Sequence, residues 1–242
     1  MHQAFEAFTN IDGRVLRTFR TLITRPGILT VAFIEGRRKP FVGPVALFLV
    51  ANVLFFGAES LTHGLVFTTP LQSHMYQQPW EALARTLVTR HLVADHTTLE
   101  LYAPRFDAAI ALHARSLILL MVVAFTPLPA LLFRRAGRPF AAHAVFALHL
   151  YAFMLLLFSI GTALPVAGEL VGRQRSTSNL LDAVLSIGLL IAGGVYLFFA
   201  LLEVYATRGV ARVLDTIALT IGMAAIVLGY RFALFLITLY TT

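Results

Sequence analysis

The sequence predicts an all-α, polytopic membrane protein with about five transmembrane helices and an N-terminal amphipathic helix in the membrane interface. Of its 242 residues, 58% are hydrophobic and 13% are charged, and the mean hydropathy is +0.80. Soluble domains are about 45–50% apolar and about 25% charged, and disorder needs low hydrophobicity. The composition therefore excludes both classes. The absence of cysteine also excludes disulfides, thiolate metal sites and cysteine nucleophiles.

Five apolar runs are long enough to cross a hydrocarbon core about 30 Å thick, which needs roughly 20 helical residues. They cover about residues 41–58, 116–133, 141–166, 180–206 and 213–240. The second run contains Pro127 and Pro129, so we expect a kink there. The first thirty residues carry repeated arginines and no uninterrupted apolar stretch, so we expect no cleaved signal peptide.

The distribution of basic residues predicts the orientation. The N-terminal segment, the loop after the second span and the loop after the fourth span hold 12 Lys and Arg, whereas the two alternate loops hold six. Cytoplasmic loops are enriched in Lys and Arg. We therefore expect the N-terminus in the cytoplasm and the C-terminus outside.

Residues 1–40 form a basic amphipathic segment ahead of a membrane domain over 41–242. One helical stripe holds Ile11, Val15, Leu16, Phe19, Leu22 and Ile23, and the other side holds Arg14, Arg17 and Arg20. This pattern is typical of a helix lying in the interface with its arginines on anionic headgroups. A second short helix is expected over 28–35. The predicted partner is the lipid bilayer, and nucleic acid is not expected.

The first external loop, about residues 59–107, is too long for a simple connection. Apolar residues at helical spacing follow Pro79, which predicts a helix that caps the bundle from outside. Its histidines are His63, His74, His91 and His96. Their gaps of 11, 17 and 5 fit no familiar ligand spacing, so no metal site is predicted.

Several polar side chains fall within or at the ends of the spans, where such groups are costly and indicate functional sites. The candidates are His149, Asn52, Arg231, Tyr151, His143, Glu203 and Glu169. By helix rise, His149 lies about 12 Å inside its span and Asn52 lies near mid-depth. We expect His149, Asn52 and Arg231 to line or gate a polar path.

Arg231 lies in the outer part of the fifth span, where an arginine either snorkels or seeks a carboxylate. The carboxylates expected at its level are Glu169, Asp182 and Glu59. Glu203 lies near the inner end of the fourth span, where His143 is the better-matched neighbour. An interhelical clamp with no transport role is the alternative for both pairs.

Small residues form a stripe on the fifth span, at Ala218, Gly222, Ala225 and Gly229, and a second set on the fourth span, at Gly188, Gly193 and Gly194. Small residues let helices approach closely in lipid. We expect the stripe to be a packing surface, either for another span or for a second copy of the chain in a homo-oligomer.

The stretch RPGILTVAFIEGRRKPFVGPVALFLVANVLFF, residues 25–56, resembles the hallmark segment of an uncharacterised family of bacterial multi-pass membrane proteins. Residues 111–133 and 138–153 resemble the same family, whose members usually carry an N-terminal CxxCG zinc ribbon that this chain lacks. A second histidine often found in the family appears here as Tyr151. The five-helix plan is more distantly similar to Yip-like membrane proteins. The resemblance implies the fold and a bacterial inner membrane, and no established activity.

No Walker loop, GxGxxG, HExxH, GxSxG or EF-hand motif occurs, so no cofactor is predicted and an enzyme is not favoured. The leading functional hypothesis is a small channel or transporter for ions or small solutes. The alternatives are a structural or membrane-organising protein, and an intramembrane metal enzyme that uses His143, His149 and His113.

Overall fold

The computed structural model describes residues 2–62, 66–170 and 179–242, and within them the side chains of 13–62, 66–164 and 184–242. Every regular element in these ranges is a helix. The helices are α1 (His2–Thr24), α2 (Ile28–Ile34), α3 (Pro44–Thr62), α4 (Leu71–Tyr76), α5 (Glu81–Ala94), α6 (Leu99–Leu117), α7 (Leu119–Phe125), α8 (Pro127–Leu132), the 3-10 turn η1 (Arg134–Ala136), α9 (Phe140–Leu170), α10 (Asn179–Tyr205) and α11 (Gly209–Thr241). The all-α prediction is confirmed.

Four described helices, α3, α9, α10 and α11, are each long and apolar enough to cross a membrane. A fifth crossing exists if α6 is joined with α7 and α8, and this pair is bent by 51°. The second predicted span, over 116–133, corresponds to the last residues of α6 with α7 and α8. The break expected at the prolines is present at Pro127, but a further bend follows Leu117 and α6 already starts at Leu99. Pro127 explains the break between α7 and α8, since it has no N–H for the helix ladder. Nothing in the structure explains the bend at Ile118.

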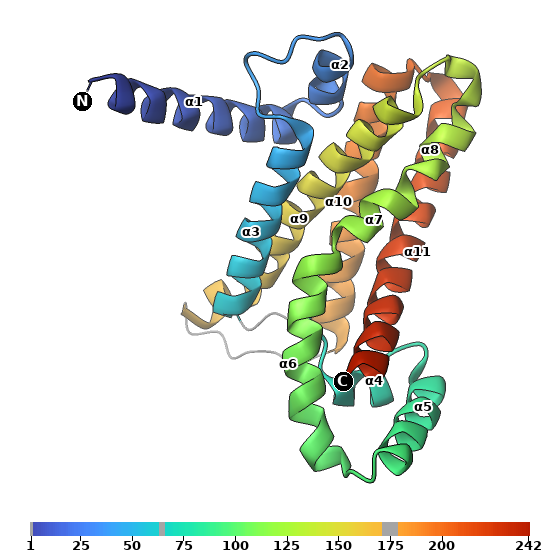
Figure 1. Ribbon diagram of the computed structural model, residues 1–242. Coiled ribbons are helices and arrows are strands. Elements are labelled where there is room, and N and C mark those ends of the chain that lie inside the picture. Colours follow the sequence, from blue (N-terminus) through green and yellow to red (C-terminus); the bar gives the residue numbers. More distant parts are fainter. Residues whose placement is uncertain (1, 63–65, 171–178) are drawn as a thin grey trace.

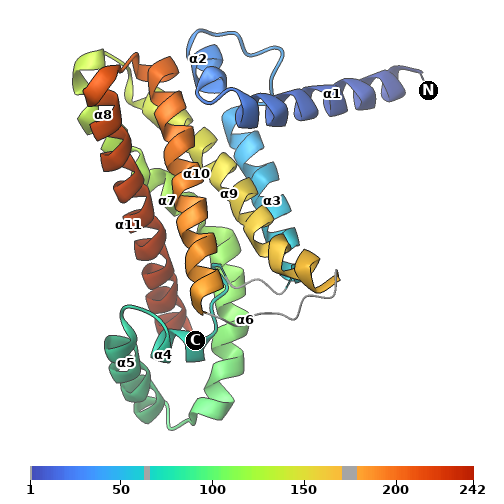
Figure 2. The ribbon, with the colours of Figure 1, turned by 180° about the vertical axis from the view of Figure 1, so that it is seen from behind.

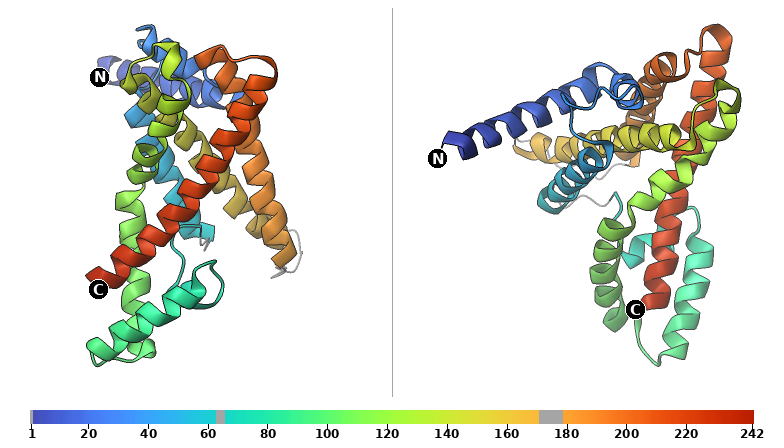
Figure 3. Two further views of the ribbon diagram at one scale, coloured as in Figure 1. Left: turned by 90° about the vertical axis from the view of Figure 1, so that its right-hand side faces the viewer. Right: turned by 45° about the horizontal axis from the view of Figure 1, so that its top comes forward.

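The long helices run lengthwise, while α1 lies across one end of the bundle beside α2 (Figures 1 and 2). At the opposite end, α4, α5 and the first turns of α6 surround the C-terminal end of α11 (Figure 3). The two helices predicted outside the spans, over 28–35 and after Pro79, are present as α2 and α5.

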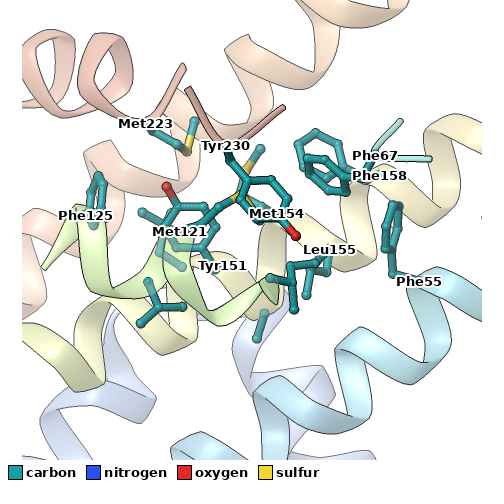
Figure 4. Packing of buried hydrophobic residues seen from close by; sticks show 14 of the residues in the cluster. Phe55, Phe67, Met121, Phe125, Tyr151, Met154, Leu155, Phe158, Met223 and Tyr230 are labelled. Atoms are coloured by element: carbon teal, nitrogen blue, oxygen red, sulfur yellow. The ribbon is translucent and has the colours of Figure 1, made fainter. Parts of the chain in front are cut away.

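The core is built around α9. In its most apolar stretch, 61% of the residues are buried, against 22–33% in α3, α10 and α11. Edge-to-face aromatic pairs join three helices to the segment before α4, which contains Phe67 (Figure 4). The centroid of the Phe67 ring lies 5.5 Å from that of Phe55 on α3, 5.8 Å from that of Phe158 on α9 and 5.3 Å from that of Tyr230 on α11. Such pairs contribute about 0.5–1.5 kcal/mol each beyond burial.

Small residues allow close helix contact at three predicted positions. A Cβ added to Gly193 would lie 2.8 Å from Met223 on α11, and one added to Gly194 would lie 3.3 Å from the Thr220 hydroxyl. On α11, a Cβ added to Gly222 would lie 2.6 Å from Leu128 on α8.

The other positions of the two sets are not covered by any residue that the structure describes. Ala218 and Ala225 are exposed, and a Cβ added to Gly188 or Gly229 would meet nothing within 4 Å. Packing of these residues against a second copy of the chain stays a prediction.

Gly27 determines how closely α2 approaches α10, and its substitution tests the α2 placement. Its φ of +87° favours glycine, and an added Cβ would lie 2.9 Å from both the Ala200 carbonyl oxygen and the Glu203 Cβ. Gly36, with φ +77°, has open space around its Cβ position. Gly36→Ala should therefore cost only the backbone term of about 1–2 kcal/mol, and Gly27→Ala should cost clearly more.

Unfolding midpoints of the two variants in detergent provide the measurement. Equal losses of stability in Gly27→Ala and Gly36→Ala would contradict the close contact of α2 with α10.

Candidate anion-binding site at the basic end

One end of the bundle is strongly basic. It is formed by α1, the α2–α3 connection, η1 and the α10–α11 turn, which lie together in Figures 1 and 2. These segments carry the 12 basic residues Arg14, Arg17, Arg20, Arg25, Arg37, Arg38, Lys39, Arg134, Arg135, Arg138, Arg208 and Arg212. The segments predicted from the sequence to share one side thus lie at one end.

A cavity of about 170 Å³ opens at this end and is called here the basic pocket. It is lined by Arg14, Leu29, Phe33, Arg37, Arg38, Phe41, Val42, Gly43 and His149. Two hydrogen bonds hold α1 against this pocket: the Arg14 guanidinium donates to the Phe41 carbonyl (2.9 Å), and the Val42 amide donates to the Thr18 hydroxyl (3.0 Å).

His149 comes from α9 and is almost fully buried. Its Nδ1 lies 2.8 Å from the Thr30 hydroxyl on α2, which is also buried. Nε2 makes no hydrogen bond within the part of the chain that the structure describes. The ring thus joins α2 to α9 through one nitrogen, and the other nitrogen has no partner among the described residues.

The three arginines are exposed and only partly engaged. Arg37 forms an ion pair with Glu35, and the Arg38 guanidinium lies 4.3 Å from the Phe33 ring centroid. A guanidinium has five N–H donors, so each arginine keeps donors available. Several cationic forks around a small cavity are suited to an anion of phosphate size.

His143 is placed elsewhere on α9. Its Nδ1 lies 2.7 Å from the Tyr205 hydroxyl, and Tyr205 stacks on Phe133 with ring centroids 4.0 Å apart. The predicted His143–Glu203 pair is wrong: Glu203 is exposed and forms no ion pair with a described residue. Residues two apart on a helix point about 200° apart, so Tyr205 faces α9 and Glu203 faces away.

Two further candidates lie on α3 and α9. Tyr151 is fully buried and edge-to-face with Phe125, at 5.7 Å, and its hydroxyl has no hydrogen-bond partner among the described atoms. Asn52 is half-buried on α3, and its side chain makes no hydrogen bond to the residues that the structure describes.

Arg231 lies toward the opposite end. One of its terminal nitrogens donates to the Thr69 hydroxyl at 3.2 Å. The predicted pairing with Glu59 is wrong, because the Glu59 carboxylate accepts from the Phe67 amide (3.1 Å) and forms no ion pair within the described ranges. The side chains of Glu169 and Asp182 lie outside the described residues.

The structure does not bring His149 and Arg231 together. Both α9 and α11 start at the basic end (Figure 1), and His149 is nine residues from the start of α9 whereas Arg231 is 22 residues from the start of α11. At 1.5 Å per residue, the two residues are separated by roughly 20 Å along the bundle. The α9 side chains Met154, Leu155 and Phe158, which lie between these levels, are buried and apolar.

The histidines of the long helices contact neighbouring helices. The described residues contain no group of three or more His, Asp or Glu that could hold a metal ion. His113 on α6 lies 3.0 Å from the Thr238 hydroxyl on α11. With His143 and His149, three histidines thus each contact a hydroxyl group of another helix.

Sequence reasoning missed the role of His74. It is buried among aromatic rings, and its Nδ1 accepts a hydrogen bond from the Trp80 indole at 3.3 Å. Its ring centroid is 5.0 Å from that of Phe235 on α11. His74 therefore helps to attach α4 to the end of α11, and its spacing from Trp80 alone carried no signal of this.

Comparison with known families concerns the basic end. Residues 12–56 match a family described as a protein of unknown function, DUF3667. No curated protein and no solved structure matches the chain. The match supports part of the resemblance given above and contains every residue that lines the basic pocket except His149. Residues 111–133 and 138–153 lie outside the match, and the Yip-like architecture stays a prediction.

The Thr30–His149 contact should be energetically significant. Thr30→Val keeps the shape but removes the hydroxyl, which leaves a buried histidine nitrogen unsatisfied and should cost about 1–3 kcal/mol. A double-mutant cycle with His149→Phe should show a coupling of at least about 0.5 kcal/mol, measured by unfolding in detergent.

Thr24→Val is the matched control, because Thr24 is exposed and bonds only to the Arg20 carbonyl of its own helix. Additive losses in the Thr30 and His149 variants would contradict a direct contact.

His74 should make stability depend on pH. Burial, with the Arg231 guanidinium nearby, lowers the pKa of His74 from 6.5 to about 4. Between these values the unfolded chain binds more protons than the folded one, so stability falls as the pH falls from about 6.5 to 4. The full effect is on the order of 3 kcal/mol.

Unfolding midpoints followed from pH 7 to 4 provide the measurement. The loss of stability that His74 causes should be absent in His74→Gln and should remain in His96→Gln, a control at an exposed histidine. The same pH slope in His74→Gln and in the wild type would refute the assignment.

Proposed function

We propose that this protein is an integral protein of a bacterial inner membrane that binds anionic phospholipid headgroups at its cytoplasmic, basic end. The observation that carries the proposal is the basic pocket, where Arg14, Arg37, Arg38 and His149 line one cavity beneath α1. In this proposal the protein organises lipid at the membrane surface and has no transport activity.

The placement of α1 supports a membrane-surface ligand. The helix lies across the end of the long helices (Figure 1), and part of its apolar stripe, Leu22, is buried against the bundle while Leu16 and Ile23 stay 72% and 53% exposed. Exposed apolar side chains beside arginines are typical of a helix at the boundary of headgroups and acyl chains. A lipid phosphate at that depth would lie level with the basic pocket.

The charge asymmetry supports the orientation. The basic end carries 12 of the 19 Lys and Arg, which the positive-inside tendency places in the cytoplasm. The cytoplasmic leaflet is rich in anionic lipid, and each nearby Lys or Arg contributes about 1 kcal/mol of attraction.

Transport through the bundle is the second candidate, and two buried polar groups favour it. The Tyr151 hydroxyl and the Arg231 Nε have no hydrogen-bond partner among the described residues, although apolar side chains fill the level between His149 and Arg231. Ion or proton flux into liposomes that falls in His149→Ala and Arg231→Ala, with folding intact, would favour transport over lipid binding alone.

Binding of short-chain phosphatidylglycerol to the detergent-purified protein tests the first proposal. We expect binding to exceed that of phosphatidylcholine and to weaken with salt, because exposed charges are screened. With about 1 kcal/mol lost for each arginine, Arg37→Gln/Arg38→Gln should bind roughly 30-fold more weakly.

The control is Arg134→Gln/Arg135→Gln, which removes the same charge from exposed residues at the same end but outside the basic pocket. Equal losses in the two double variants would show that attraction is diffuse and that the basic pocket is not the binding site.

A further inference from the structure

A second cavity, of about 540 Å³, lies between α9, α10 and α11 on the side of the bundle away from the basic end. Among the described residues of its lining, all but Arg231, Ser186 and Thr162 are apolar, and they include Met154, Phe158 and Met223, which are labelled in Figure 4. It is called here the acyl cavity, and it shares no residue with the basic pocket.

The mouth of the acyl cavity is on the outer surface of the helix bundle. Ser186 and Leu190 of α10 and Leu228 of α11 line the cavity and are exposed, so the cavity opens to the surface at these residues. An opening with exposed leucines from two candidate spans faces the region where lipid chains would lie in a membrane.

Arg231 is the one cationic group among the described residues of the lining. Its guanidinium makes one hydrogen bond, to Thr69, and its buried Nε has no partner within the described ranges. No described carboxylate lies within 4 Å of it. Nearby His74 accepts a hydrogen bond at Nδ1, which is the behaviour of a neutral ring. Among the described lining residues, one positive charge therefore faces a largely apolar space.

The order of residues on α11 gives the direction of a ligand. Met223, Ala224, Val227 and Leu228 precede Arg231 and line the cavity over about 12 Å of helix. Arg231 lies about 28 Å from Arg212 by helix rise, which is close to one hydrocarbon thickness. A ligand with its anionic head at Arg231 would thus lie with its chain toward the middle of the bilayer, as lipids do.

We propose that the acyl cavity binds one long-chain fatty acid anion, with its carboxylate on Arg231 and its hydrocarbon chain between α9, α10 and α11. At about 30 Å³ for each group of the size of a water molecule, 540 Å³ has room for about 18 groups, which is enough for one long acyl chain. One guanidinium balances the single charge of a carboxylate and can bind it in a bidentate manner.

Binding of radiolabelled palmitate to the full chain in detergent is the test, with hexadecanol as the uncharged analogue. We expect one palmitate per chain, at least tenfold weaker binding in Arg231→Gln, and binding within threefold of the wild type in Arg231→Lys. Hexadecanol should bind weakly and equally to the wild type and Arg231→Gln. Palmitate that binds no better than hexadecanol would overturn the proposal.

A matched pair on α11 tests the chain-binding part independently of Arg231. Ala224 lines the acyl cavity, whereas its neighbour Ala225 is exposed and does not. Ala224→Phe should abolish palmitate binding and Ala225→Phe should preserve it, with unfolding midpoints confirming that both variants fold. Equal binding in these two variants would overturn the proposal.

Two other occupants would give different results. If a diacyl phosphatidic acid displaces palmitate at equal or lower concentration, the cavity holds a phospholipid and the single-chain assignment is wrong. If the wild type binds no palmitate and Glu169→Gln/Asp182→Asn gains binding, Arg231 is already paired with a carboxylate of its own chain, and the proposal also fails.

Discussion

The fold depends on the packing of α9 on nearly all sides. Its most apolar stretch is the most buried of the four long helices, and α2, α3, α7, α8 and α10 all contact it. A helix that satisfies its own backbone hydrogen bonds can be buried in this way without cost from unpaired peptide groups. Among the buried polar side chains of α9, His149 and His143 find partners in hydroxyl groups on α2 and α10, whereas the Tyr151 hydroxyl has none among the described atoms.

This arrangement changes the meaning of the polar residues predicted inside the spans. A polar group in a long apolar helix suggests a pathway when the helix is considered alone. In the assembled structure, His149 contacts Thr30 just outside the spans, and Arg231 contacts Thr69 in the segment before α4. The short segments at the two ends of the bundle provide these partners. His149 and Arg231 thus attach end segments to the long helices, and each of the two residues lines a separate cavity.

The sequence was sufficient to predict the helical class, the four single long helices and the basic end. Each of these predictions rests on local composition or on the summed charge of a loop. The bend after Leu117 was not predictable, since no proline or glycine marks it. The interaction partners of the polar side chains were harder to predict than the helices. Glu203 and His143 have compatible chemistry and depth, yet the rotation of α10 directs Tyr205 toward His143. Helix rotation depends on packing across the whole bundle, which one sequence does not encode in a readable pattern. Helix rotation also explains why only part of the predicted small-residue stripe is a contact: Gly222 packs against Leu128, whereas no described residue lies within 4 Å of the Cβ position of Gly229.

The arginines at the two ends of the molecule differ in their exposure and in their surroundings. At the basic end, the arginines are numerous and exposed, so solvent and salt moderate each of them and their effect is collective. Toward the other end, Arg231 is a half-buried cation that lines a largely apolar cavity. A charge in such a place is costly unless it is paired, and the described residues give it only a neutral hydroxyl. The demand for a counter-charge is therefore stronger at Arg231 than at any arginine of the basic pocket. An anion bound there would stabilise the fold itself, since it would bind the folded chain and not the unfolded one.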